Sequence, residues 1–489
     1  MIRTYINRHD LEYYLYAMVK AFMKDAKVLA PDTAKHNEPI FDEPEDKDVL
    51  RVSIGQRDVD INVVAGLYLK SDASRHYEYS GPADDDVKVF AQKVIYQFMA
   101  GYTGRELPWG NLTGIRPTKL YLNRLNEGKS RQQAIDELKA LHMVSDEKSE
   151  LGVSIAEREK AIIEKVSNNN GYSIYIGIPF CPSTCLYCSF TSNPIFSYKE
   201  KIGDYLSCIK KELEATRQIM AGRVLDTIYI GGGTPTALSH TELDTLLSYV
   251  MECCDMSNVK EFTVEAGRAD SITKEKFEVM RKYPVSRISI NPQTMNDKTL
   301  KLIGRHHSAA DVVEAFNKAR ELGFDNINMD IILGLPGETL ADIEYTLNGI
   351  KALSPDSLTV HSLAVKRASR LKQLMDENPL AVSMDFEKAM DMSIEAASAM
   401  GLDPYYLYRQ KDMAGNLENT GFARTGKYGL YNIVMMEEVQ TIIACGAGTV
   451  TKRVYGDGRI ERCDNVKDVA LYISKIEEMI DRKRHLFKD

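Results

Sequence analysis

Short apolar runs alternate with amphipathic helical patterns from Ser173 onward, and this alternation constrains the fold more than any other feature. Six runs are typical of buried strands: 173–178, 227–230, 261–265, 287–290, 327–332 and 357–363. Apolar residues recur three and four positions apart between them, which predicts helices at 199–219, 239–253, 273–281, 309–322 and 340–353. Repeated strand–helix units make the strands parallel, so we predict an α/β fold with a partial (β/α)6 barrel.

The first 165 residues lack this regular alternation. Their mixed pattern predicts strands at 4–6, 49–54 and 59–67 and helices at 11–22 and 84–102. Beyond residue 401 the chain is rich in Gly, Tyr and Asn before a terminal helical pattern. We therefore expect an N-terminal α+β domain over 1–165, the barrel over 166–400 and a C-terminal cap over 401–489.

The composition, 44% hydrophobic and 27% charged, is that of an ordinary globular protein. The 62 basic and 70 acidic side chains leave a net charge of -8, which argues against general electrostatic binding of nucleic acid or anionic lipid. No stretch approaches the roughly 18 apolar residues of a membrane span, and the N-terminus has no apolar signal core. We expect a cytoplasmic monomer that binds no nucleic acid.

Three of the eight cysteines directly follow the first predicted strand, with the spacing C-x3-C-x2-C: Cys181, Cys185 and Cys188. Soft thiolates select zinc, copper(I) or iron–sulfur clusters, and a zinc site normally has a fourth Cys or His nearby, which does not follow here. Three thiolates on a four-iron cluster leave one iron open for chemistry. The remaining cysteines have no partner spacing and are predicted to pack as small hydrophobes: Cys208, Cys253, Cys254, Cys445 and Cys463.

The cysteine spacing at the end of a first barrel strand resembles the radical S-adenosylmethionine (SAM) enzymes. Glycines 231–233 follow the second predicted strand, where we expect their backbone amides to approach a ligand, and polar residues end the later strands, where barrels place active sites. This ordered set over 173–364 resembles, more narrowly, the oxygen-independent coproporphyrinogen III oxidase family. Residues 112–119, 404–411, 415–419 and 445–448 resemble its HemZ-type branch.

The resemblance implies a 4Fe-4S cluster on the three cysteines and SAM on its open iron. It also implies catalytic roles for Tyr175 and Glu265. The residues that match SAM-binding positions of the family are Tyr175, Tyr187, Gly232, Gly233, Thr234, Glu265, Gln293, Arg305, Asp330 and Ala364.

The sequence departs from the family pattern at two positions near the cysteines. The best characterised oxidases have a fourth cysteine where this chain has Phe190, and a histidine where it has Gly177. These departures concern a second SAM site and proton handling. The related haem chaperones carry a His-Asn and an aromatic pair near the C-terminus, whereas the nearest stretch here is 429–432.

The family reaction is oxidative decarboxylation of propionate side chains of coproporphyrinogen III, so the resemblance implies a tetrapyrrole substrate and a flavodoxin- or ferredoxin-like electron donor. We expect Arg367, Tyr406 and Arg409 to contact the substrate, because cations pair with carboxylates and aromatic faces suit a flat macrocycle. Other candidates are Lys366, Arg370, Lys411, Arg116, Lys119, Tyr405, Tyr408, His306 and His307. The alternatives are a haem-binding chaperone of the same fold, a radical methyltransferase and an anaerobic haem-degrading enzyme.

Overall fold

The computed structural model of the 489-residue chain describes residues 2–23, 28–29, 48–57, 60–68, 75–82, 86–113, 116–166, 170–190, 192–364, 370–371, 384–409 and 417–488. Their contacts group into two compact units. The first runs to Ser154 and includes Arg409 and Leu417, and the second contains most of the remaining chain. Among the described residues, no helix is long and apolar enough to cross a membrane. The three domains expected from the sequence stay a prediction.

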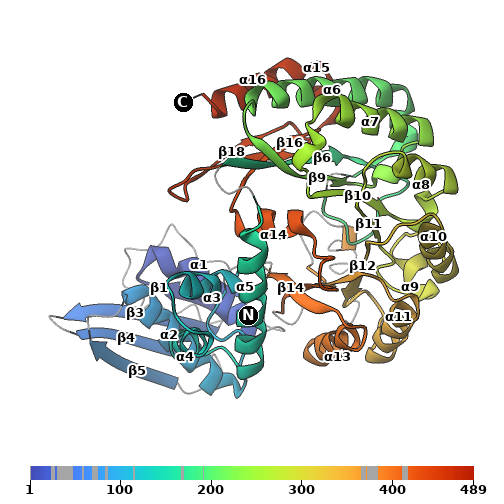
Figure 1. The fold of residues 1–489 in the computed structure, drawn as a ribbon. Helices are drawn as coiled ribbons and strands as arrows, with labels where there is room; N and C mark the ends of the chain where they lie inside the picture. The colour runs from blue at the N-terminus through green and yellow to red at the C-terminus, as the bar shows by residue number, and fades with distance from the viewer. Residues whose placement is uncertain are drawn as a thin grey trace. The chain divides into compact units, whose positions relative to one another are not determined.

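The first unit is built on a five-stranded sheet in the order β2-β1-β3-β4-β5 (Figure 1). Its strands are β1 (Ile2–Ile6), β2 (Val28–Leu29), β3 (Asp48–Arg57), β4 (Asp60–Tyr68) and β5 (Arg75–Pro82). The three predicted strands are present, and β2 and β5 are additions. Its helices are α1 (His9–Phe22), α2 (Val87–Thr103), α3 (Thr118–Asn126) and α4 (Arg131–His142), and α5 (Asp146–Ile163) begins in this unit and ends in the second.

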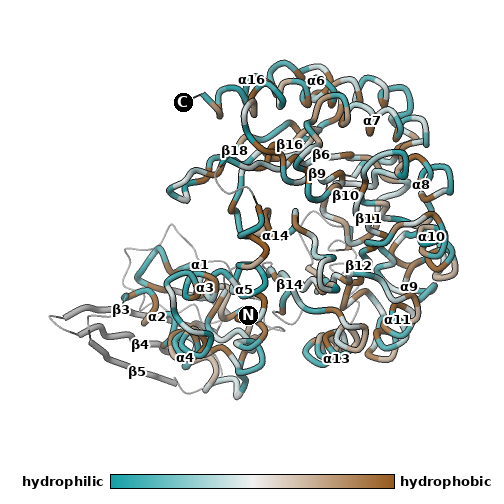
Figure 2. Tube along the Cα trace, in the orientation of Figure 1, coloured by the Kyte–Doolittle hydropathy of each residue, from teal (hydrophilic) through white to brown (hydrophobic). Residues whose placement is uncertain are grey.

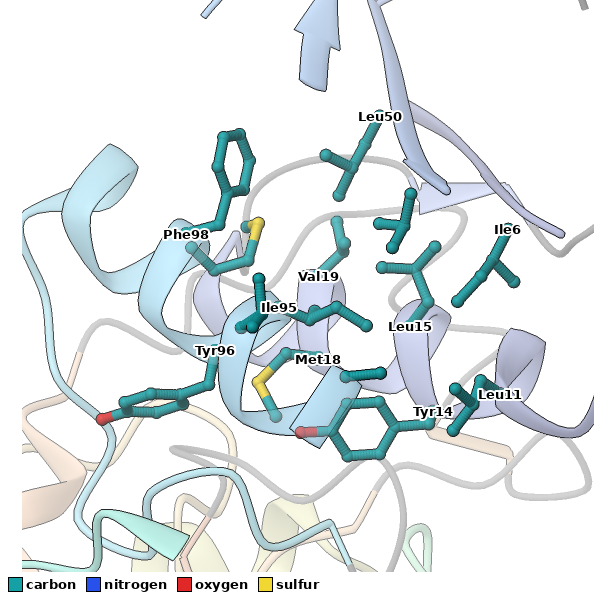
Figure 3. Packing of buried hydrophobic residues seen from close by; sticks show 14 of the residues in the cluster. Ile6, Leu11, Tyr14, Leu15, Met18, Val19, Leu50, Ile95, Tyr96 and Phe98 are labelled. Carbon is teal, nitrogen blue, oxygen red and sulfur yellow. The ribbon is translucent and has the colours of Figure 1, made fainter. Parts of the chain in front are cut away.

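The core of this unit lies between the sheet and the first two helices (Figure 3). Leu11, Leu15 and Met18 recur on one face of α1 and are almost fully buried, as are Ile95 and Met99 on α2. The helical spacing of these residues gives each helix one apolar stripe, and burying both stripes together stabilises the pair.

The second unit contains six parallel strands in chain order at the centre of an eleven-stranded sheet. They are β6 (Gly171–Ile178), β9 (Val224–Gly232), β10 (Glu261–Gly267), β11 (Arg287–Ile290), β12 (Ile327–Leu333) and β13 (Ser357–Ser362). Each strand is buried along most of its length, as expected for parallel strands covered on both faces. All six predicted strands are confirmed, and with them the α/β fold with a partial (β/α)6 arrangement.

Helices connect these strands, and hydrophilic and hydrophobic residues alternate along them (Figure 2). They are α6 (Ile202–Ile219), α7 (His240–Cys253), α8 (Lys274–Arg281), α9 (Asp297–Leu302), α10 (Ala309–Glu321) and α11 (Leu340–Leu353). Ser239, Thr273 and Ser308 cap the first turns of α7, α8 and α10 with their side-chain oxygens. These caps explain why the predicted helix starts lie within a residue of the observed ones.

The C-terminal strands extend the same sheet at both of its edges. β15 (Asn419–Ala423) pairs antiparallel with β13, and β14 (Asp403–Tyr408) pairs with β15. At the other edge β16 (Thr441–Cys445) runs parallel to β6 and is followed by β17 (Val450–Val454) and β18 (Ile460–Asp464). The helices of this region are α13 (Phe386–Ala399), α14 (Leu430–Glu437), α15 (Val469–Ser474) and α16 (Ile476–Leu486).

Candidate functional site

The cysteine loop, residues 181–188, follows β6 after Pro179 and leaves Cys181 and Cys185 buried and Cys188 half-buried. Its first residues form β7 (Phe180–Cys181), which pairs with β8 (Asn193–Pro194). The Leu186 amide donates to Ile303 O at 2.9 Å, and Ser183 Oγ donates to Gly304 O at 3.1 Å. The loop is therefore bound to the turn that follows α9.

The donor chemistry of this loop fits an iron–sulfur cluster. Three thiols on one loop supply the soft sulfur ligands that iron–sulfur clusters take, and two of them, Cys181 and Cys185, are buried. The pKa of Cys181 is raised to about 11, chiefly by burial; the charges of Cys188 and Cys185 contribute to the rise, and a 3.4 Å hydrogen bond from Thr234 to the sulfur opposes it. Bound iron supplies the positive charge that keeps such thiols deprotonated.

The glycine-rich segment after β9 packs against the end of β6. A Cβ on Gly233 would lie 2.6 Å from Phe180 O and 2.8 Å from Ile178 O. The amides of Gly233 and Thr234 donate to these two carbonyls, at 2.7 Å each. The Gly233 amide therefore has a backbone acceptor, and the expected approach of the amides of 231–233 to a ligand stays a prediction. The glycines are needed for close contact between the two chain segments, and Gly232 also has φ of +107°.

Glu265 lies near the end of β10, where Tyr229 Oη donates to its Oε1 at 2.5 Å. Burial raises the pKa of Glu265 to about 7; the charge of Asp330 adds to this rise and the Tyr229 hydrogen bond opposes it. Tyr229 stacks on Tyr431 with ring centroids 4.6 Å apart, and both stack on Tyr175, at 6.0 and 6.1 Å. The structure thus brings the two predicted catalytic residues together through Tyr229.

Asp330, on β12, lies beside a histidine that the sequence analysis did not single out. His361 Nε2 is 3.7 Å from Asp330 Oδ2, and its Nδ1 is 3.5 Å from Tyr408 Oη. Burial alone would raise the pKa of Asp330, but the contact and charge of His361, with hydrogen bonds from Asn328 and Thr359, hold it below its usual value. His361 lies near the end of β13, as Glu265 lies near the end of β10. A search of the sequence for every polar residue near the end of a predicted strand would therefore have found it.

The other residues predicted to bind SAM occupy the same strand ends or border the cysteine loop. Gln293 has φ of +67°; its amide donates to Asp330 O and its carbonyl accepts from the Ile332 amide, both at 2.9 Å. Arg305 is buried and donates to Tyr187 Oη at 3.2 Å and to Asn291 O at 2.5 Å. Ala364 follows β13 and is half-buried. Their roles in SAM binding stay predictions.

The residues predicted to contact the substrate lie in different surroundings. Tyr406 is 5% exposed, and it packs with Tyr405, Ile162 and Ile433 in an apolar cluster. Arg409 is also buried and donates to Leu112 O in the first unit. Neither residue offers an open surface in this conformation, whereas Tyr408 is half-buried and contacts His361.

The remaining candidate cations and histidines are dispersed. Arg367, Lys366 and Lys411 lie outside the described residues, and Arg370 is exposed. Arg116 and Lys119 belong to the first unit. His306 and His307 line a cavity of about 390 Å³ together with Asp270 and Lys318. A shared substrate site for these side chains therefore stays a prediction.

The two departures from the family pattern have different surroundings. A Cβ on Gly177 would lie 2.5 Å from Thr449 Cγ2, so the turn after β16 fills the space that a larger side chain would need. Phe190 is 71% exposed, two residues after Cys188. In this packing a larger side chain at position 177 would therefore require Thr449 to move.

Comparisons with known proteins agree with this geometry. The model of a family described as the Radical SAM superfamily matches residues 175–350. The oxygen-independent coproporphyrinogen-III oxidase-like protein HemZ of Bacillus subtilis is 38% identical over 446 residues, 89% of each chain. The haem chaperone HemW of the same organism is 32% identical over 63% of this chain and 76% of its own.

A solved structure shares the fold. Coproporphyrinogen III oxidase (HemN) from Escherichia coli aligns with a TM-score of 0.50 and 21% identity, over 66% of this chain and 73% of its own. At this identity the likeness concerns the fold alone.

Proposed function

Since the chain belongs to the radical SAM superfamily, and within it to the family of HemZ, the coproporphyrinogen-III oxidase-like protein, we propose that it converts coproporphyrinogen III to protoporphyrinogen IX without oxygen. The observation that carries this proposal is the match to HemZ, which covers 89% of both chains, beyond the barrel that many radical SAM enzymes share. Each reacting propionate loses one hydrogen atom, carbon dioxide and one electron, and a vinyl group remains.

Radical SAM proteins use a 4Fe-4S cluster and SAM, which when bound supply a 5′-deoxyadenosyl radical able to abstract the hydrogen atom. In this chain Cys181, Cys185 and Cys188 would hold the cluster, since they are the three thiols of one loop. The strand-end residues around Glu265 and Asp330 would hold SAM. A flavodoxin- or ferredoxin-like protein would serve as reductant.

The protein residues at the strand ends orient the reactants and set the local charge. Tyr229 donates to one carboxylate oxygen of Glu265 and the Gly232 amide also bonds to this carboxylate, whose remaining lone pairs could accept from a ribose hydroxyl or an amino group. Because burial brings the pKa of Glu265 to about 7, a bound sulfonium cation would favour the ionised form of this carboxyl. The stacked rings of Tyr175, Tyr229 and Tyr431 exclude water from this side of the group.

His361 is the group best placed to meet a substrate carboxylate at these strand ends. Its side chain is 28% exposed and is held between Asp330 and the Tyr408 hydroxyl. An imidazole N–H and a phenol O–H can both donate to a carboxylate, and the substrate carries several carboxylates. His361 would thus take the role that the sequence analysis gave to Tyr406 and Arg409.

The haem chaperone function is a second candidate, because HemW of Bacillus subtilis is 32% identical over 63% of this chain. One structural observation weighs against it. The 429–432 stretch, which is nearest to the chaperones' C-terminal His-Asn, places Tyr431 against Tyr229 and Tyr175, and Gly429 beside Tyr405. Residues of this stretch are thus packed against other side chains, and none of the four is a histidine.

The test is anaerobic reconstitution of the full chain with iron and sulfide, followed by incubation with SAM, a reductant and either coproporphyrinogen III or haem. The oxidase predicts 5′-deoxyadenosine together with loss of carbon dioxide from coproporphyrinogen, seen by mass spectrometry. Stoichiometric haem binding without SAM cleavage would replace the oxidase by the chaperone. Methyl transfer or ring opening would indicate one of the other radical reactions.

A matched pair of variants tests the cluster assignment. Cys185→Ala should lose the cluster absorbance and 5′-deoxyadenosine formation. Cys208→Ala is the control, because this cysteine is buried on α6 with its sulfur near Ile473 O, outside the loop. An unchanged cluster in Cys185→Ala would refute the assignment.

A further inference from the structure

Arg268 reaches the cysteine loop from the end of the neighbouring strand. It follows Gly267 at the end of β10 and is only 3% exposed. One guanidinium nitrogen, Nη1, donates to Ser183 O at 2.8 Å and contacts Cys185 Sγ at 3.4 Å. A buried positive charge thus lies directly against one of the three proposed ligand sulfurs.

Asp270 fixes the orientation of this guanidinium. Arg268 Nε donates to Asp270 Oδ1 at 2.9 Å and Nη2 donates to Oδ2 at 2.5 Å, which is the bidentate pairing that arginine makes with carboxylates. Burial alone would raise the pKa of Asp270, but the His307 ring, whose Nδ1 lies 3.7 Å from Oδ1, and the hydrogen bonds from Arg268 hold it well below its usual value. The carboxylate stays ionised, and because it occupies two nitrogens it leaves Nη1 directed at the loop.

The backbone around Arg268 is anchored to the glycine-rich segment. Ser271 Oγ donates to Arg268 O at 2.7 Å and lies 2.7 Å from Thr236 Oγ1. Lys276 Nζ donates to the carbonyls of Thr236 and Ser271, at 2.6 and 2.8 Å. Since backbone and side chain are both fixed, little conformational entropy remains for the arginine to lose when the loop binds its cluster.

We propose that Arg268, oriented by Asp270, is a positioning residue that holds the cysteine loop and raises the reduction potential of the cluster through Cys185. Reduction adds one negative charge to the cluster, and a buried cation that donates to a ligand sulfur stabilises the reduced form more than the oxidised form. The proposal rests on the three cysteines holding the cluster, as proposed above, and does not depend on which tetrapyrrole is the substrate.

The experiment is a redox titration of the reconstituted full-length protein without SAM or substrate, followed by electron paramagnetic resonance. Arg268→Gln should shift the midpoint potential to more negative values. Arg268→Lys, which keeps the charge but cannot form the fork, should shift it less. Arg320→Gln is the matched control, because Arg320 pairs with Asp356 at 2.6 Å on α10 and should leave the potential unchanged.

The outcomes separate this proposal from the proposed function. Wild-type potential in an Arg268→Gln protein with full iron content would overturn the role of Arg268. If that variant fails to fold or to bind iron, a second variant, Asp270→Asn, keeps the Arg268 guanidinium and removes the carboxylate that orients it. It should then show a smaller negative shift, and wild-type potential in Asp270→Asn would overturn the proposal. Failure to convert coproporphyrinogen would refute the proposed reaction but leave the potential shift in place.

Discussion

Glu265→Gln should stabilise the folded protein above neutral pH while weakening SAM binding. Glu265 is held near Asp330 and Tyr229 with a pKa of about 7, against an ordinary value of 4.5. In the folded state this carboxyl therefore resists ionisation. Glutamine keeps an oxygen that can accept from Tyr229 but has no charge to desolvate.

The magnitude follows from linkage between protonation and folding. The unfolded chain releases the Glu265 proton near pH 4.5 and the folded chain near pH 7, so between these values the folded state binds more protons and its stability falls as pH rises. A rise of about 2.5 pKa units corresponds to a cost of roughly 3 kcal/mol above pH 7. About 2 kcal/mol of this cost develops between about pH 5.5 and pH 8.5.

The assay is urea unfolding of the full-length apoprotein at these two pH values. The single tryptophan, Trp109, lies in the first unit, so its fluorescence would follow that unit rather than the barrel. Deuterium exchange of the peptide that covers β10, measured by mass spectrometry, follows the strand itself. We expect Glu265→Gln to gain about 2 kcal/mol more at the higher pH than at the lower one.

A control and a binding measurement complete this test. Glu278→Gln removes an exposed carboxyl that pairs with Lys274 on α8, so it should change stability by less than about 0.5 kcal/mol at either pH. SAM affinity of the reconstituted Glu265→Gln protein should fall, because the carboxylate that faces the cation is gone. An equal gain at both pH values would refute the buried-charge argument.

Two further variants test packing around the site. Gly233→Ala should destabilise the protein by about 1–3 kcal/mol and reduce SAM affinity, because the new Cβ would overlap two carbonyl oxygens. The control is Gly203→Ala on α6, which should be neutral or stabilising because nothing lies within 4 Å of the new Cβ. Melting curves compare the two variants. Lys483→Met leaves the buried Glu212 without its charge partner and should lower the free energy of unfolding by about 3–5 kcal/mol. The control, Lys211→Met, breaks only an exposed ion pair and should lower it by less than about 1 kcal/mol. Urea titrations measure both.

Local sequence signals located the barrel accurately because they are set by short-range chemistry. Strands such as β11 and β12 are buried along most of their length and are rich in isoleucine, which favours strands. The helix starts follow from caps such as Ser239 and Ser308, whose side chains bond within three residues. The position of the cysteine loop after β6 follows from the same order of elements.

Other features depended on residues far apart in the chain. The sequence did not indicate that β16 would pair with β6, almost 270 positions earlier, or that its following turn would place Thr449 against Gly177. The stack of Tyr175, Tyr229 and Tyr431 depends on that same return of the chain. The aromatic ring of Tyr406 suggested contact with a flat substrate, yet Tyr406 is buried in an apolar cluster.

By itself the sequence thus determined the α/β class, the six parallel strands and the loop that carries three thiols, since burial periodicity, capping and spacing act within a few residues. Only the tertiary structure decided which side chains face one another there: Tyr229 on Glu265, His361 on Asp330 and Arg268 on Cys185. These pairs depend on strand register and on the competition among many residues for a shared interior, which no local pattern encodes.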